Sequence, residues 1–366
     1  MYDEVKIPND ILNTGNNHME ILAYCQNESS FSYRKGEPSL IFELEIDGKV
    51  AVYSSEQTLV TRDTPFQSGE VEKITKQLLY SFVYDRKWAE APSYFNSVVL
   101  ENSSYEYTKR PIPQLTVSEP IGAKIIAQGV FIDSKRATGG EAVFYDYLSA
   151  RSFSELSGGE RYLPCKDGVS LNCEDGDGIY ALIDLGRESA GYLLLDVEVE
   201  GDCRIVCGYG EHLNDLRVRS SVNGRSFGFT VNARKGRNTV FWPIKRLGAR
   251  YLQLHAQCHS IKLYYVGLRS VDYPFDEVRV PIGLNTLQRR IYDVAVSTLR
   301  LCAHEHYEDT PWREQGLYAM DSRNQMMFCY YAFGETLLTR ESLRLLALGQ
   351  KSYGLLELCA PCDLVG

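Results

Sequence analysis

The chain has 366 residues, 44% of them hydrophobic and 24% charged, which is typical of a globular protein with more than one core. Its net charge is −9 and its pI is about 5.3. This acidic balance argues against a nucleic-acid or anionic-membrane partner, because a phosphate surface requires a basic footprint.

The N-terminal segment, residues 1–8, has neither the apolar core nor the cleavage pattern of a signal peptide. No stretch approaches the roughly 20 apolar residues that span a bilayer. Ten cysteines with irregular spacing, several of them in apolar runs, indicate reduced and buried thiols. We therefore expect a cytoplasmic protein with no membrane partner.

β-Strand patterns dominate the chain as far as Tyr273-Pro274. Phe42, Leu44 and Ile46 alternate with glutamates, and Asp47-Gly48 then turns the chain towards a second alternating run, which indicates a hairpin. The stretch 76–115 is less regular and rich in tyrosine and proline, which is typical of a linker or a domain boundary.

A second β region follows this boundary. Alternating apolar residues predict strands over 179–183 and 192–197, and two further strand-like runs, 251–254 and 261–266, flank a turn. Several strands at short spacing, with glycine-containing turns between them, favour a β-sandwich or a jelly roll.

After Pro274 the period becomes helical. Asn285 is a candidate N-cap, and it precedes an apolar stripe of Leu287, Ile291, Val294 and Ala295. A second helix is expected to open at Thr310-Pro311, with Thr310 as the cap. A third is expected over 341–350.

The segment 309–321 carries most of the chemistry. Three carboxylates, Asp309, Glu314 and Asp321, lie within thirteen residues, with Trp312 and Arg313 between them. Cleavage of a glycosidic bond needs such groups, one protonated to serve the leaving oxygen and others ionised for water or sugar hydroxyls. On a helix, Glu314 and Asp321 would share one face, and Asp309 would lie just ahead of the N-terminus, where an anion is favoured.

These residues resemble the Asp-(Cys)-Pro-x-Arg-Glu-…-Asp signature of the bacterial α-L-rhamnosidases, with Thr310 in place of the frequent Cys. The family comprises inverting glycoside hydrolases with a six-hairpin (α/α)6 barrel. Segments of the second β region, 209–212, 223–225, 246–251 and 265–268, resemble the β-sandwich that precedes the barrel in that family.

The resemblance implies two jelly-roll-like β-sandwich domains, over 1–115 and 116–278, followed by the first helices of the barrel over 279–366. It also implies that the first sandwich lacks its initial strands, since residues 4–46 are similar to the second half of the family's sandwich. Twelve barrel helices need more than about 200 residues. A chain with 86 residues from 281 onward is therefore expected to be partial and inactive alone.

The same resemblance assigns roles to the carboxylates. Glu314 is expected to be the general acid, with its pKa raised by anionic neighbours, and Asp309 and Asp321 to bind sugar hydroxyls. Trp312 could stack on a sugar face or pack between helices, and Arg313 could orient a carboxylate. No residue of the sequence matches the family's general base, which is expected in the missing part of the barrel. No cofactor is implied.

Three alternatives stay open at this point. The chain could be a non-catalytic carbohydrate-binding or scaffold fragment, or the barrel could act on another deoxysugar. Without the resemblance, three carboxylates in a chain with 48 Asp and Glu would more simply form a solvated helix face. The spacing of Cys302, His304 and His306 would suit a metal, but no fourth ligand is evident, so we expect no metal site.

Overall fold

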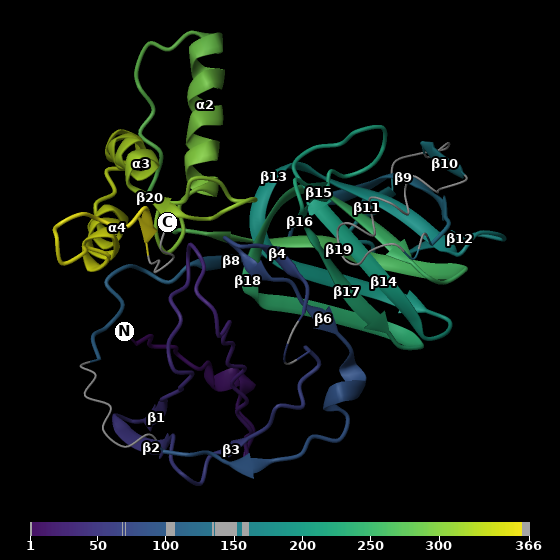
Figure 1. Cartoon of the computed structure of the whole chain (residues 1–366), viewed down its shortest axis with the longest axis horizontal. Coiled ribbons are helices and arrows are strands. Elements are labelled where there is room, and N and C mark those ends of the chain that lie inside the picture. Colours follow the sequence, from purple (N-terminus) through teal and green to yellow (C-terminus); the bar gives the residue numbers. More distant parts are fainter. Residues whose placement is uncertain are drawn as a thin grey trace.

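A computed structural model describes residues 2–67, 69, 71–99, 107–133, 135, 152–155 and 161–360 of the chain. Figure 1 shows three regions: a large sheet, a group of helices, and an N-terminal region that runs alongside both. Within the described residues, no helix combines the length and the apolar character needed to cross a membrane.

The N-terminal region consists of short elements. Its strands form three two-stranded sheets, β1–β2, β3–β7 and β4–β5, while β6 pairs in parallel with the main sheet. The elements are η1 (Asn9–Ile11), β1 (Glu43–Ile46), β2 (Lys49–Tyr53), β3 (Leu59–Val60), β4 (Lys73–Thr75), β5 (Leu79–Tyr80), β6 (Val83–Tyr84), η2 (Arg86–Ala89) and β7 (Phe95–Asn96).

The hairpin expected around residue 47 is confirmed. β1 and β2 pair antiparallel, and Asp47 and Gly48 both have positive φ, +51° and +72°, as a tight two-residue hairpin turn requires. The β-sandwich expected over 1–115 as a whole remains a prediction.

The main sheet has eleven strands among the described residues. They are β6 and β8 (Thr116–Pro120), β9 (Ala123–Phe131), β10 (Ser152–Glu155), β11 (Arg161–Leu163), β12 (Val169–Asn172), β13 (Gly178–Val199), β14 (Cys203–Gly210), β17 (Gly228–Ala233), β18 (Gly236–Ala256) and β19 (Ser260–Asp272). A separate small hairpin joins β15 (Ser221–Val222) to β16 (Arg225–Ser226).

Two long strands, β13 and β18, organise this sheet. The strands expected over 179–183 and 192–197 are parts of the single strand β13, because it stays paired with β18 on both sides of an irregularity between Asp184 and Ser189. The first half of β13 also pairs with β9 and the second half with β19. Apolar side chains from both halves enter one core, so the sheet encloses it.

The two runs that flank the turn near residue 258 belong to β18 and β19. These strands do not pair with each other. Instead, β19 lies on the opposite side of β13 from β18. The turn therefore leads the chain from the start of β13, where Ile179 pairs with Ala256, to its end, where Val199 pairs with Ile261.

Three α-helices follow the sheet within the described residues: α2 (Thr286–Leu301), α3 (Ala319–Ala332) and α4 (Leu337–Leu348). Two short strands, β20 (Leu317–Tyr318) and β21 (Cys359–Ala360), pair beside them. Figure 1 shows the helices grouped at one end of the sheet. Continuation into an (α/α)6 barrel remains a prediction.

The start of α2 is as expected, but its buried face is not. Asn285 Oδ1 accepts from the backbone N–H of Gln288 at 2.9 Å, and the Gln288 side chain accepts from the Asn285 N–H at 3.0 Å, which forms a capping box. The predicted stripe, however, points outward: Leu287 is 67% and Ile291 60% exposed. The helix packs instead through a different face that includes Val296 and Leu299.

The prediction that a helix opens at Thr310-Pro311 is wrong. Residues 311–314 form a turn, and α3 begins nine residues after Thr310, at Ala319. Thr310 therefore caps no helix. The helix expected over 341–350 is present as α4, which begins four residues earlier.

Candidate active site

The segment 309–316 is a closed loop between α2 and β20. The backbone N–H of Asp309 donates to the Gly316 carbonyl at 3.0 Å, and the Gly316 N–H donates back to Asp309 Oδ1 at 2.9 Å. Inside this closure, Gln315 adopts a positive φ of +54°, which is uncommon for a residue with a side chain. The Gln315 side chain compensates by donating to the Pro311 carbonyl at 2.8 Å and to the Arg246 carbonyl at 3.2 Å.

The loop packs tightly on the main sheet. Trp312 is only 4% exposed, its ring lies 4.6 Å from that of Phe227, and it belongs to the core of the sheet. Two glycines allow this approach: a Cβ on Gly248 would lie 2.3 Å from the Pro311 carbonyl oxygen, and one on Gly210 would lie 3.2 Å from the Trp312 ring. In this structure Trp312 anchors the loop and does not present its ring to a sugar.

A buried cluster of Arg246, Glu308 and His304 holds the start of the loop against the sheet. Glu308 is fully buried and accepts hydrogen bonds from Arg246, while His304 Nδ1 lies 3.3 Å from its carboxylate. Burial alone would raise the pKa of Glu308, but Arg246 and then His304 outweigh it and hold the pKa well below its ordinary value. Glu308 is therefore favoured as an anion, and its ion pair with Arg246 ties the loop to β18.

Asp309 is partly buried at the edge of this cluster. Burial raises its pKa to about 6, and the nearby charges of Glu314 and Glu308 act in the same direction, against the hydrogen bond from the Gly316 N–H. Asp309 therefore changes between its protonated and ionised forms near pH 6. Glu314 is thus close enough to Asp309 to influence its pKa.

Glu314 is held by a single tyrosine. The Tyr318 hydroxyl donates to Glu314 Oε2 at 2.7 Å, and the Tyr318 ring packs edge-to-face on Phe31 at 5.8 Å. Because Tyr318 belongs to β20, and Phe31 to the N-terminal region, two separate segments fix the orientation of this carboxyl group.

The other two expected site residues lie on the surface. Arg313 and Asp321 are both exposed, Arg313 in the turn and Asp321 in the first turn of α3. Glu314 and Asp321 do not share a helix face, because Glu314 precedes the helix. Asp309 likewise does not lie at a helix N-terminus. The structure thus brings Asp309 and Glu314 together on one loop and places Asp321 on the neighbouring helix.

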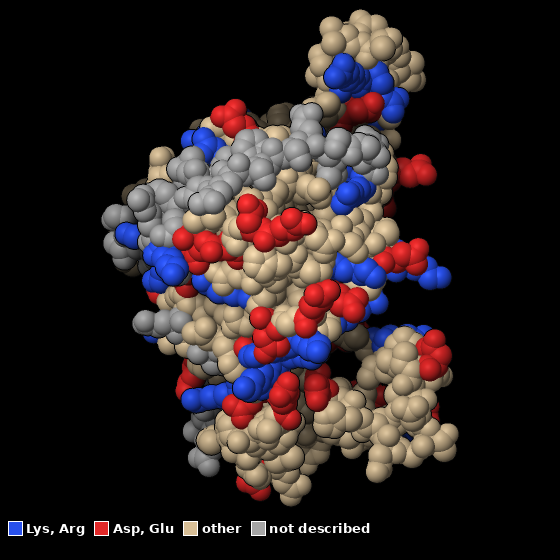
Figure 2. Space-filling model, turned by 90° about the vertical axis from the view of Figure 1, so that its right-hand side faces the viewer, with Lys and Arg blue, Asp and Glu red and all other residues tan. Residues whose placement is uncertain are grey.

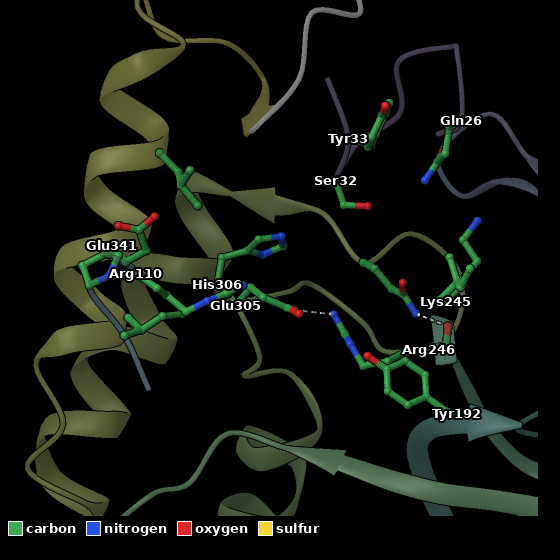
Figure 3. Close-up of a pocket in the computed structure, with 15 residues that line it drawn as sticks. Gln26, Ser32, Tyr33, Arg110, Tyr192, Lys245, Arg246, Glu305, His306 and Glu341 are labelled. Carbon is green, nitrogen blue, oxygen red and sulfur yellow. Dashed lines mark hydrogen bonds and ion pairs between the residues drawn. The ribbon is translucent and has the colours of Figure 1, made fainter. Parts of the chain in front are cut away.

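A cavity of about 350 Å³ lies beside the loop (Figure 3). Arg246 and Glu305 meet across it at 3.2 Å, and Lys245 also faces it, with a pKa that burial lowers to about 7. Gln315 is the residue of the loop that lines this cavity; Asp309, Glu314 and Asp321 do not. The cavity is therefore a neighbour of the candidate carboxylates and not the space that they enclose.

The side chains of the possible metal motif diverge. His304 faces Glu308, His306 Nδ1 hydrogen bonds to the Tyr307 carbonyl at 2.8 Å, and Cys302 Sγ lies 4.0 Å from the Asp309 carbonyl. The described part of the chain contains no group of three or more His, Cys, Asp or Glu residues that could hold a metal ion.

Comparison with solved structures places this geometry in a known fold. The structure matches a GH78 family rhamnosidase of Bacillus sp. GL1 with a TM-score of 0.69 and 16% identity, over 91% of this chain and 55% of that one. It also matches a Streptomyces avermitilis α-L-rhamnosidase complexed with L-rhamnose, with a TM-score of 0.52 and 15% identity, over 79% of this chain and 25% of that one. No protein-family model and no curated protein sequence matches the chain.

At these identities the likeness establishes a shared fold. The chain spans about half the length of the Bacillus rhamnosidase and a quarter of the Streptomyces enzyme. What those proteins bind or cleave is therefore a basis for a proposal about this chain.

Sequence reasoning missed the residues that hold the loop in place. Arg246, Glu308 and Tyr318 carry no role in the predicted site, although Arg246 and Tyr318 lie in segments that resemble the rhamnosidases. The two partners of the ion pair are 62 residues apart, so only the folded chain shows their contact. Gly248, two residues after Arg246, was an available signal, because a glycine within a strand often marks a close backbone approach.

Proposed function

We propose that this chain belongs to a glycoside hydrolase that cleaves terminal α-L-rhamnosides with inversion, and that Glu314 is its general acid. The observation that carries the proposal is the position of Glu314 and the partly buried Asp309 on one loop, which is packed on the sheet in a fold shared with rhamnosidases. The L-rhamnose in the Streptomyces structure supports a deoxysugar as the substrate.

In this mechanism protonated Glu314 donates its proton to the glycosidic oxygen as the bond to the sugar breaks. The Tyr318 hydroxyl then stabilises the carboxylate that is left, because it can donate a hydrogen bond to the anion at the position it already occupies. Asp309 and Asp321 accept hydrogen bonds from sugar hydroxyls. An inverting enzyme also needs a base about 6.5–9.5 Å from the acid, and we assign that role to no residue of this chain.

Binding and turnover test separate parts of the proposal. Saturation-transfer NMR should show L-rhamnose bound to the chain, with D-mannose as the control sugar, and Asp309→Asn should weaken binding because it removes an anionic acceptor. If L-rhamnose fails to bind in preference to D-mannose, the deoxysugar assignment is wrong.

Turnover is measured with nitrophenyl and alkyl α-L-rhamnosides on the intact protein that contains this sequence. Glu314→Gln should lower the rate on the alkyl glycoside by about 100-fold or more, because a poor leaving group depends on the acid, and should affect the nitrophenyl glycoside less. Equal rates for variant and wild type on the alkyl glycoside would remove Glu314 as the acid. Rhamnose binding without turnover of either substrate would favour a carbohydrate-binding role.

A further inference from the structure

Three cysteines gather at one end of the main sheet. Cys203 opens β14, Cys258 lies in the turn between β18 and β19, and Cys173 directly follows β12. All three are partly exposed, in contrast to Cys207 in the same strand as Cys203, which is fully buried. These three residues are therefore less enclosed than Cys207, although they still pack against the core.

The strand register sets Cys203 opposite Cys258. Ile205 pairs with Ala256, and the Gln257 N–H donates to the Arg204 carbonyl at 2.9 Å. The strand pairing ends there, and Cys203 and Cys258 are the residues directly beyond the hydrogen-bonded contact between Arg204 and Gln257, so the two cysteines stand side by side where the strand β14 meets the turn. A disulfide needs Cα atoms about 4.4–6.8 Å apart, a range that residues facing each other across hydrogen-bonded backbone segments commonly reach.

The two thiols already interact. Each is the main influence on the other's protonation: Cys258 raises the pKa of Cys203, and Cys203 lowers the pKa of Cys258 below its ordinary value. Cys258 is thus the better nucleophile of the pair, since the thiolate is the reactive form. Cys173 has a different neighbour, because its Sγ lies 3.4 Å from His259 Nδ1.

We propose that Cys203 and Cys258 form a reversible disulfide when the protein meets a peroxide. The Cys258 thiolate attacks one peroxide oxygen, the O–O bond breaks, and the departing hydroxide takes a proton to become water. The Cys203 sulfur then attacks the resulting sulfenic acid, the S–O bond breaks, and a second water leaves. Two thiols are oxidised to one disulfide, and one hydrogen peroxide is reduced to two waters.

The cross-link would act on the sheet and not on the candidate site. Cys203 stands at the start of β14, whereas Gly210 at its other end contacts Trp312. A bond from β14 to the β18–β19 turn closes a long loop of the chain and restricts the unfolded state, which raises the stability of the oxidised form. This inference does not depend on the proposed glycosidase activity.

The test treats the native protein with hydrogen peroxide, blocks the remaining thiols with an alkylating agent, and maps the peptides by mass spectrometry. We expect a linked pair of peptides that contain Cys203 and Cys258, lighter by two hydrogens than the separate peptides and separated by dithiothreitol. The oxidised protein should also melt at a higher temperature than the reduced one.

Three variants complete the test: two change the proposed pair and one is the control. Cys203→Ser should abolish both the linked peptides and the shift in melting temperature. Cys258→Ser should do the same, and it provides the test if Cys203→Ser folds poorly. Cys165→Ser, which changes a partly buried cysteine packed on the same core, should leave both unchanged. Recovery of Cys203 and Cys258 as separately alkylated or over-oxidised residues, or a link from Cys173 to Cys258, would overturn the proposal.

Discussion

The ion pair between Arg246 and Glu308 shows how a contact between two side chains fixes the position of the loop 309–316. The guanidinium is the main counter-charge for a carboxylate that has no exposure to solvent, and it also reaches Glu305 at 3.2 Å. A buried pair of this kind contributes little relative to apolar residues, but removing one partner leaves an isolated buried charge. The pair therefore fixes where the loop sits more than it adds net stability.

Replacing Arg246 tests this. Arg246→Met should lower the free energy of unfolding by about 3–5 kcal/mol, because Glu308 loses its cation. Arg289→Met is the matched control, since its ion pair with Asp293 is half exposed and such pairs contribute about 0.5 kcal/mol. Urea unfolding gives both values, and similar losses in the two variants would contradict the assignment.

Glu188 is a second residue with a distinct electrostatic role. It lies in the irregular part of β13, and burial, with the charge of Glu211 acting in the same direction and Arg250 opposing it, raises its pKa from 4.5 to about 8. The folded state therefore holds this proton more tightly than the unfolded state does. The resulting stability is present in full below pH 4.5 and is lost as the pH rises through 8.

Glu188→Gln should remove this dependence, since an amide does not ionise. Relative to wild type, the variant should gain stability as the pH rises from 5 to 9, by on the order of 3 kcal/mol after allowance for partial exposure. Unfolding midpoints in urea at the two pH values measure the difference. If the difference in unfolding free energy between variant and wild type were the same at both pH values, the pKa of Glu188 would not be raised.

At the scale of elements, the loop 309–316 is shaped by contacts with strand β18. Gly248 is required because a side chain there would meet the Pro311 backbone, which cannot move without breaking the Gln315 hydrogen bond to Pro311. The position of Asp309 and Glu314 therefore depends on a glycine that makes no contact with either carboxylate.

Gly248→Ala should destabilise the protein by about 1–3 kcal/mol, because the added methyl overpacks the contact between strand and loop. It should also change the tryptophan fluorescence, since Trp312 follows Pro311. Gly201→Ala serves as the control, because a Cβ there meets nothing within 4 Å. Unchanged stability and fluorescence in Gly248→Ala would show that the loop can shift freely.

At the scale of the molecule, charged side chains of both signs are mixed on one face, whereas the helices expose large apolar side chains. Figure 2 shows basic side chains lying among acidic ones on the face that it presents. The helices, by contrast, expose large apolar side chains: Ile291 on α2 is 60%, Phe328 on α3 58% and Leu348 on α4 63% exposed. Surfaces of this kind favour association.

We therefore expect the 366-residue chain to associate as its concentration rises. Ile291→Lys should reduce association measured by sedimentation velocity, because it places a charge on the apolar face of α2. Ser297→Lys adds the same charge at an already polar position of the same helix and should have a smaller effect. A monodisperse wild-type chain over a wide concentration range would refute this expectation.

Local signals in the sequence predicted local structure well. The Asp47-Gly48 turn and the Asn285 capping box are set by short-range backbone preferences, so the residues themselves determine them. The same holds for the strand periodicity of the second β region. The start of α3 was wrong because Thr310-Pro311 is a good helix-opening signal that tertiary contacts override: Pro311 and Trp312 pack on the sheet instead.

The sequence by itself determined the strand-rich composition, the capping of α2 and the presence of three carboxylates within one short segment, since each depends on neighbours along the chain. Only the tertiary structure decided that Trp312 is buried, that Asp309 and Glu314 share a loop apart from Asp321, and that Arg246 holds Glu308. These outcomes depend on contacts between residues tens of positions apart, and burial and Coulomb interactions act through space without regard to order along the chain.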